Sequence, residues 1–248
     1  MMFKHFIITR FNIGFRQQNR GNQLKYPVDA NTWMEHRLGI FLKYCAPAIH
    51  RQTRQDFQWI IIVDESTLSE HINIIQNECD HICVVSSNTQ LFGQQWIPQV
   101  RQLIRSNTDT EFVITTKLDN DDILHNKFVY WIHNIIKQED VYGFINGRRN
   151  LVVDFANGFS LDTTTGVFYK YAYTNCGSSV GSLLEPNTDE LKTVYYKTHD
   201  KLPWCDHYLL LPYRAYARCI HGCNLLNFIN EQHQQKLAFI PEGFHISV

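Results

Sequence analysis

The sequence has neither a long hydrophobic run nor an excess of one charge. Its longest apolar stretches, such as residues 59–63, fall far short of the roughly 20 residues that a membrane-spanning helix needs. Lysine and arginine together number 23 and the acidic residues 24, which gives a formal net charge of −1. Because the whole chain has no strong field, we expect no nucleic-acid partner, and any phosphate must be held by a local site.

The chain also lacks the signs of secretion and of disulfide cross-linking. Its apolar start is interrupted at Arg10, without the small residues of a signal-peptide cleavage site, so residues 3–9 are expected to form a strand. The seven cysteines are odd in number and scattered, and a chain of 248 residues needs no cross-links. These features predict a cytoplasmic protein with reduced thiols.

What the sequence does contain is a regular alternation of strand-like and helix-like segments. Hydrophobic residues make up 44% of the chain, which is enough for a substantial core. Strands are predicted at residues 3–9, 57–63, 82–86, 112–116 and 141–146, and helices at residues 33–44, 68–77, 94–106, 126–137 and 206–216. This order predicts an α/β fold with a doubly wound, mostly parallel sheet flanked by helices.

The texture of the sequence changes near residue 148. Short aromatic and β-branched segments at residues 151–155 and 166–173 predict an antiparallel hairpin. Residues 175–186 are rich in Gly and Ser and indicate a loop, and residues 215–224 indicate a further strand. We therefore expect a smaller, antiparallel extension of the sheet in the second half of the chain.

Three carboxylates follow the predicted strand at 112–116 within four positions: Asp119, Asp121 and Asp122. Carboxylates this close repel one another, and a hard divalent cation with oxygen ligands offsets that cost. Open α/β sheets also bind their ligands at the carboxyl ends of the strands. The sequence therefore predicts a Mn²⁺ or Mg²⁺ site here, with the cation bridging the phosphates of a nucleotide. In the alternative interpretation, Asp119 caps the next helix and the other two are surface acids.

Several segments that include this cluster resemble one known family. The octet TTKLDNDD at 115–122, the segment 33–65 and the motif IHGCN at 220–224 are similar to the rhamnosyltransferase family of bacterial glycosyltransferases, which has the GT-A fold. The resemblance extends from about residue 6 to residue 227. The residues that match its characteristic helix and turn are Trp33, His36, Arg37, Phe41, Cys45, Pro47 and Ile49. Lys117 stands where the family more often has arginine.

The resemblance implies a metal-dependent glycosyltransferase. Such an enzyme moves a sugar, L-rhamnose if the family's name holds, from a nucleoside diphosphate sugar to a glycan or lipid-linked acceptor, with inversion at the anomeric carbon. Residues 1–147 would then form the nucleotide-sugar-binding half and residues 148–248 the acceptor-binding half of one continuous domain. Peripheral association with a membrane stays open, and the family name alone does not identify the sugar.

The resemblance also implies roles on the donor side. Asp64, at the end of the second predicted strand, would contact the base or ribose of the nucleotide, and Arg10 would pair with a phosphate. Asp119 and Asp121 would be the Asp-x-Asp pair that binds the metal and the nucleotide, with Asp122 orienting it. The residues by themselves leave two other roles open, a helix N-cap for Asp64 and a surface ion pair for Arg10.

A late histidine would complete the metal or diphosphate site. His221 in IHGCN is preferred, with Asn224 in support, because the adjacent glycine allows close backbone approach; His245 is the other candidate. The residues that could instead suggest zinc are Cys79 with Cys83, and Cys219 with His221 and Cys223. Neither group supplies a complete tetrahedral set, so structural thiols are expected.

An inverting transferase also needs a carboxylate that takes the proton of the acceptor hydroxyl. The segment PWCD at 203–206 resembles the aromatic-then-acid element that carries this base in several inverting GT-A families, so Asp206 is expected to be the base. Asp206 would equally suit the N-cap of the helix predicted after it. Asp154, Asp162 and Asp200 are the reserve candidates.

Two other functions fit the same fold. A nucleotidylyltransferase would need a glycine-rich phosphate loop with a basic residue after the first strand, and residues 11–23 match that pattern poorly. A sugar-nucleotide or glycan-binding module would keep the fold without catalysis. Hydrolysis of the donor would separate the transferase from the binding module, which predicts none.

Overall fold

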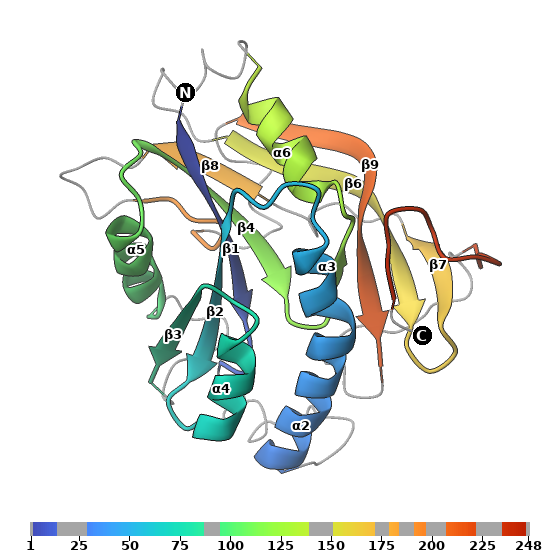
Figure 1. Cartoon of the computed structure of the whole chain (residues 1–248). Coiled ribbons are helices and arrows are strands. Elements are labelled where there is room, and N and C mark those ends of the chain that lie inside the picture. Colours follow the sequence, from blue (N-terminus) through green and yellow to red (C-terminus); the bar gives the residue numbers. More distant parts are fainter. Residues whose placement is uncertain are drawn as a thin grey trace.

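The computed structural model describes residues 2–13, 29–86, 95–138, 151–171, 179–183, 191–196, 207–221 and 235–246. Within these residues, nine strands form one sheet with helices packed against it (Figure 1). The strand order is β3-β2-β1-β4-β8-β6-β9-β5, and β7 pairs with β6 outside this path. The parallel half confirms the predicted α/β class, whereas the extension is mixed and not antiparallel as predicted, because β6 and β9 pair in parallel.

The parallel half consists of β1 (Phe3–Arg10), β2 (Gln58–Asp64), β3 (His81–Val85) and β4 (Phe112–Asp119). These strands match the predicted ones, and each neighbouring pair is parallel. The centre of β2 is Ile60, Ile61 and Ile62, all with 0% exposure, because helices cover both faces of this part of the sheet.

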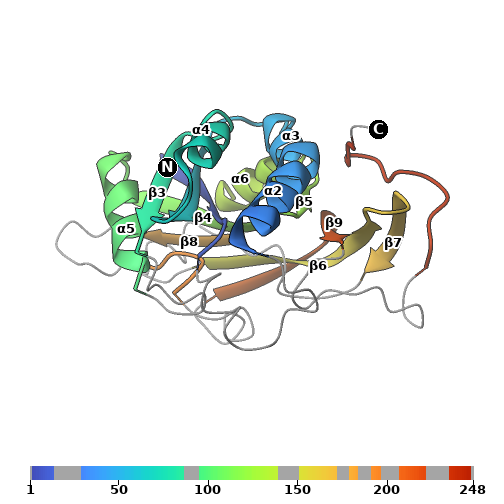
Figure 2. The same cartoon turned by 90° about the horizontal axis from the view of Figure 1, so that it is seen from below.

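The helices divide between the two faces. Helices α2 (Ala30–Ile40), α4 (Ser69–Gln76) and α6 (Phe128–Ile136) contribute to one buried cluster with alternate residues of the strands. Figure 2 shows these three helices together on one side of the sheet. Helix α5 (Ile97–Ser106) contributes to a second cluster with the strand residues of opposite parity. The sheet is therefore doubly wound, as predicted.

The helix that starts at Ala30 is longer than predicted. It continues from α2 through a π-helical segment, η2 (Phe41–Cys45), into α3 (Ala46–His50), whereas the sequence predicted residues 33–44. It begins earlier because the Asp29 carboxylate accepts from the backbone N–H groups of Asn31 and Thr32, each at 3.0 Å. Pro47 does not end it, because this proline lies in the first turn of α3.

The second half of the chain extends the same sheet. Strand β8 (Ser179–Leu183) pairs antiparallel with β4, and β6 (Leu151–Asp162) pairs with β8. The predicted hairpin is confirmed as β6 and β7 (Val167–Tyr171). The short strand β5 (Ile123–Leu124) pairs with β9 (His207–Ile220). The division at residues 147 and 148 stays a prediction.

Two secondary-structure predictions in this half are wrong. Residues 207–216 belong to strand β9 and not to a helix, because they pair in parallel with β6. The pairing shifts register between Phe155 and Asn157, and Pro212 lies at this irregularity, where its carbonyl accepts from the Asn157 side chain at 3.1 Å. Part of the predicted loop at 175–186 is strand β8.

The strand predicted at residues 141–146 lies outside the described residues. In the described part of the chain, no helix is both long enough and apolar enough to cross a bilayer.

Candidate functional site

The predicted acidic cluster lies at the carboxyl edge of the parallel strands. The pairing of β1 and β4 sets Arg10 directly opposite Asp119. Just beyond the strands, the Asn120 side-chain amide donates to the backbone carbonyl of Phe11 at 2.8 Å, and Asn120 is 1% exposed. This buried bond ties the ends of β1 and β4 together, so the acids that follow β4 are held on an ordered segment.

Asp119 has two basic neighbours. Lys117 Nζ lies 3.3 Å from one carboxylate oxygen, and Arg10 Nη2 lies 3.8 Å from the other. Burial alone would raise the pKa of Asp119, but the positive charges of Lys117 and Arg10 outweigh it and lower the pKa. Asp119 is therefore a carboxylate at neutral pH. It does not cap a helix, because the next helix, α6, begins only at Phe128.

Asp121 is held more tightly. Arg37 Nη1 donates to Asp121 Oδ2 at 2.7 Å, and His221 Nε2 lies 3.0 Å from the same oxygen. The side chains of Arg37 and Asp121 are only 12% and 8% exposed, so this is a buried ion pair. Although burial opposes ionisation, the charge of Arg37 and the hydrogen bond from His221 hold the pKa of Asp121 well below its usual range.

Arg37 links the helix to the acidic cluster. Besides Asp121, it donates through Nη2 to Asn120 Oδ1, and its Nη1 lies 2.8 Å from His221 Nε2. The guanidinium carbon sits 5.4 Å from the ring centroid of Trp33, one helical turn earlier on α2. Sequence reasoning gave Arg37 and Asn120 no role, although the four-residue spacing of Trp33 and Arg37 was a signal that both share one helix face.

His221 also joins this network, and its predicted contact with a metal or diphosphate stays a prediction. Its Nδ1 lies 3.3 Å from His36 Nε2, and burial, His221 and Arg37 together lower the pKa of His36. With one proton on the His221 ring nitrogens, Nε2 either accepts from Arg37 or donates to Asp121. The other candidate, His245, is exposed and follows Phe244, whose ring packs against His125.

Asp122 differs from its two neighbours. Its pKa is raised well above the usual range, first by burial and then by the charges of Asp121 and Asp119, while Arg218 acts in the opposite direction. Its Oδ1 is buried without a hydrogen-bond partner among the described residues. The three acids are therefore not equivalent: Asp119 and Asp121 are stabilised as anions, and Asp122 is not.

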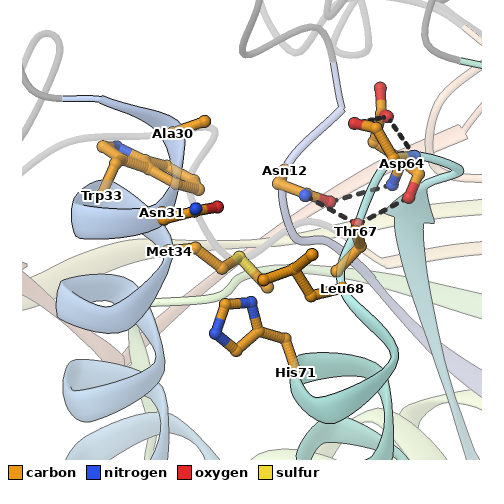
Figure 3. A pocket seen from close by; sticks show the side chains of 10 residues that line it. Asn12, Ala30, Asn31, Trp33, Met34, Asp64, Thr67, Leu68 and His71 are labelled. Atoms are coloured by element: carbon orange, nitrogen blue, oxygen red, sulfur yellow. Dashed lines mark hydrogen bonds between the residues drawn. The ribbon is translucent and has the colours of Figure 1, made fainter.

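A pocket opens beside the cluster, between α2 and the segment that follows β2 (Figure 3). Trp33 and Met34 line one side, Thr67 and Leu68 the other, and Asn12 lies between them. Other lining residues are Ala30, Asn31, Asp64, Ser66 and His71. Because Trp33 lines the pocket and also contacts Arg37, the pocket adjoins the acidic cluster.

Asp64 shapes the rim of this pocket. Its Oδ1 accepts from the backbone N–H of Ser66 at 2.8 Å, and its backbone N–H donates to Asn12 Oδ1 at 2.9 Å. Asp64 is not the N-cap of the following helix, because α4 begins at Ser69 with Leu68 as its N-cap. Asp64 and Arg10 lie at the ends of β2 and β1, and their nucleotide-binding roles stay predictions.

Several predicted residues lie elsewhere. The expected base Asp206, the supporting Asn224 and the reserve Asp200 are outside the described residues. Asp154 is fully buried and accepts from the Tyr208 hydroxyl at 3.0 Å. Asp162 forms the β6–β7 turn, where its Oδ1 accepts from the backbone N–H of Thr164 at 2.9 Å. Both of these acids therefore have structural partners.

The described cysteines are free thiols: Cys45, Cys79, Cys83 and Cys219. Burial raises the pKa of each. Among the residues that the structure describes, no three histidine, cysteine or acidic side chains form a cluster that could hold a metal ion. Cys223 lies outside that set.

Most of this chain matches one known family. The model of a family described as "Putative rhamnosyl transferase" matches residues 5–224. A comparison with curated proteins finds no match. Among solved structures, S. aureus TarS 1-349 is 13% identical, with 87% of this chain and 60% of that chain covered and a TM-score of 0.39. This chain thus spans about three fifths of that length.

Two further structures cover similar shares of this chain. HddC from Yersinia pseudotuberculosis is 11% identical, with 87% of this chain and 93% of that chain covered and a TM-score of 0.42. The inositol-1-phosphate CTP transferase from T. maritima is 10% identical, with 87% and 89% covered and a TM-score of 0.42. Similarity at this level does not indicate a shared function.

The GT-A fold often uses a divalent cation, and the predicted ligands were Asp119, Asp121 and His221. Arg37 Nη1 lies 2.7 Å from Asp121 Oδ2 and 2.8 Å from His221 Nε2. A metal ion bound by Asp121 Oδ2 and His221 Nε2 would have to be coordinated by lone pairs that here face the Arg37 guanidinium. With Arg37 in place, the residues therefore do not fit the predicted metal.

Proposed function

Because the chain belongs to the family described as "Putative rhamnosyl transferase", we propose that it transfers a sugar, with L-rhamnose the first candidate, from a nucleoside diphosphate sugar to a glycan or lipid-linked acceptor. The observation that carries this proposal is the pocket beside the charged cluster at the carboxyl edge of the sheet. A nucleoside and its diphosphate need these two environments side by side.

The nucleoside occupies the pocket in this proposal. The Trp33 ring offers an aromatic face to the base, and the Asp64 carboxylate accepts hydrogen bonds from ribose hydroxyls. Asn12 lies between these two side chains and can bind either the base or the ribose (Figure 3). The diphosphate then extends toward Arg37, whose guanidinium contacts the Trp33 ring.

The basic residues of the cluster stabilise the leaving group. As the bond between the anomeric carbon and the phosphate oxygen breaks, negative charge develops on the nucleoside diphosphate. Arg37, Arg10 and Lys117 are already fixed by Asp121 and Asp119, so little reorganisation is needed to meet that charge. Asp119 and Asp121 act here by positioning these cations.

The acceptor reacts from the other side of the anomeric carbon. Its hydroxyl oxygen forms the new bond to carbon while the phosphate oxygen leaves, and Asp206 takes the hydroxyl proton. This order of events inverts the configuration at that carbon. Residues 148–248 supply the acceptor-binding half in this proposal.

We place the reaction in the cytoplasm. Activated sugar nucleotides are the donors in this scheme, and the four described thiols are free. A lipid-linked acceptor would bring the enzyme into peripheral contact with a membrane.

The test is release of nucleoside diphosphate from a panel of thymidine, uridine and guanosine diphosphate sugars, including a rhamnosyl donor, with and without Mn²⁺. We expect slow hydrolysis of one donor by the wild type and by Asp109→Asn, a matched change at an exposed residue. Asp119→Asn should be slower, because Lys117 and Arg10 lose their fixed partner. Turnover of no donor under either condition would contradict the proposal, as would release of pyrophosphate from nucleoside triphosphates instead.

A further inference from the structure

We infer that Arg37 takes the place of a divalent cation at Asp121 and His221, binds the donor diphosphate directly, and makes sugar transfer independent of metal. The inference rests on the proposed function, because it names the charge that acts at the same site. It concerns a residue for which the sequence predicted no chemistry.

The first support is the position of the guanidinium. One nitrogen, Arg37 Nη1, lies within hydrogen-bonding distance of Asp121 Oδ2 at 2.7 Å and His221 Nε2 at 2.8 Å. These two atoms are themselves only 3.0 Å apart, a separation that suits two ligands of one cation. The Arg37 nitrogen therefore contacts two of the three side chains that were predicted to bind the metal.

The second support is the balance of charge. The predicted need for a cation came from three neighbouring acids, Asp119, Asp121 and Asp122. The structure places Lys117 and Arg10 beside Asp119 and Arg37 beside Asp121. The protein's own side chains therefore already supply positive charge to the two acids that were predicted to bind a metal.

The third support is that Arg37 is fixed before a donor binds. Asn120 accepts from Nη2, and the Asn120 amide is itself held by the Phe11 carbonyl. The Trp33 ring packs against the guanidinium. A charge held in this way needs little rearrangement to stabilise a developing anion, as a bound metal ion does.

Arg37 also has one N–H group that no described residue satisfies. Its Nε is buried and has no hydrogen-bond acceptor among the described residues. A buried N–H without an acceptor is costly, and a phosphate oxygen would supply one. The planar guanidinium can then bind a phosphate through two parallel hydrogen bonds, which a lysine cannot do.

The first experiment measures donor turnover in EDTA and in Mn²⁺. We expect the wild-type rates to agree within about twofold. A loss of tenfold or more in EDTA that Mn²⁺ restores would overturn the inference while leaving the proposed function intact. If no donor turns over in either condition, the proposed function fails, and the metal-binding measurement below still decides about Arg37.

The second experiment measures Mn²⁺ binding by the electron paramagnetic resonance of the free ion. We expect the wild type and Asp121→Asn to bind no Mn²⁺ at this site, and Arg37→Ala to gain a site that Arg37→Ala/Asp121→Asn lacks. Binding of one Mn²⁺ to the wild type that Asp121→Asn abolishes would overturn the inference. That comparison does not depend on whether Arg37→Ala folds.

A third experiment separates a role in donor binding from a structural role. Arg37→Lys keeps the charge but loses the planar fork, so we expect a rise in the donor KM and a lower kcat. Arg51→Gln, at an exposed arginine just after α3, is the matched control and should match the wild type. Unchanged donor kinetics in a folded Arg37→Lys variant would contradict direct contact with the diphosphate.

Discussion

Replacing Arg37 with methionine should destabilise the protein through Asp121. The change removes the guanidinium that donates to Asp121 Oδ2, and it leaves a carboxylate that is 8% exposed. Breaking a buried pair from one side costs about 3–5 kcal/mol. Because His221 can still donate to Asp121, we expect the lower end, about 3 kcal/mol of unfolding free energy.

The pH dependence follows from the lowered pKa of Asp121 in the folded wild type. Such a group stabilises the fold above the unfolded pKa, about 3.9, and this contribution is lost only as the pH falls through the lower folded value. In Arg37→Met, burial without the guanidinium raises the pKa of Asp121, so the folded variant binds a proton more readily. The stability difference between variant and wild type should therefore shrink as the pH falls from 7 toward 4.5.

Urea denaturation in EDTA measures this effect. The matched variants are Asp121→Asn and the double variant Arg37→Met/Asp121→Asn. We expect the double variant to be more stable than the sum of the single changes predicts, by about 2 kcal/mol, because it has no uncompensated charge. Additive losses, or an Arg37→Met loss under about 1 kcal/mol at pH 7, would refute the buried ion pair as the organising contact of the site.

Three further predictions follow from other residues. Trp33→Ala should weaken nucleoside diphosphate binding about two- to thirteenfold in calorimetric titrations, because an aromatic contact of about 0.5–1.5 kcal/mol is lost, whereas Tyr130→Ala on the exposed surface of α6 should not. Asp206→Asn should lower turnover about a hundredfold or more while donor affinity is kept; equal loss in Asp109→Asn would exclude a specific role. Burial lowers the pKa of His133 to about 4, so the folded protein binds this proton only at a lower pH than the unfolded chain does. Stability should therefore fall by about 1.4 kcal/mol for each pH unit between 6.5 and about 4. The same decline in His133→Gln would argue against this histidine as its source.

The parallel half of the fold could be predicted from the sequence. Residues such as Ile60, Ile61 and Ile62 form a continuous apolar run because both faces of β2 are covered, and this is a strong local signal. The place of the acidic cluster could also be predicted, since the end of a buried strand is the ligand-binding edge of an open sheet. These inferences depend on residues that are close together in the chain.

The partners of the acids could not be predicted in the same way. Arg37 and Asp121 are far apart in sequence, and only the packing of α2 against the sheet brings them together. The local sequence pattern also gave the wrong secondary structure for β9, because Leu209, Leu210 and Leu211 are compatible with a helix as well as with a strand. Pairing with β6 decided the outcome. The predicted metal site was incomplete for the same reason, because two of the neighbouring basic side chains, Arg10 and Arg37, come from other parts of the chain.

The central claim, a nucleotide-sugar site formed by the pocket and the cluster around Arg37, is tested most directly by calorimetric titration with thymidine, uridine and guanosine diphosphates in EDTA. We predict that at least one binds the wild type and Arg51→Gln with equal affinity and binds Arg37→Lys about tenfold more weakly. Binding of none of the three to the wild type, or equal binding to all three proteins, would contradict the account.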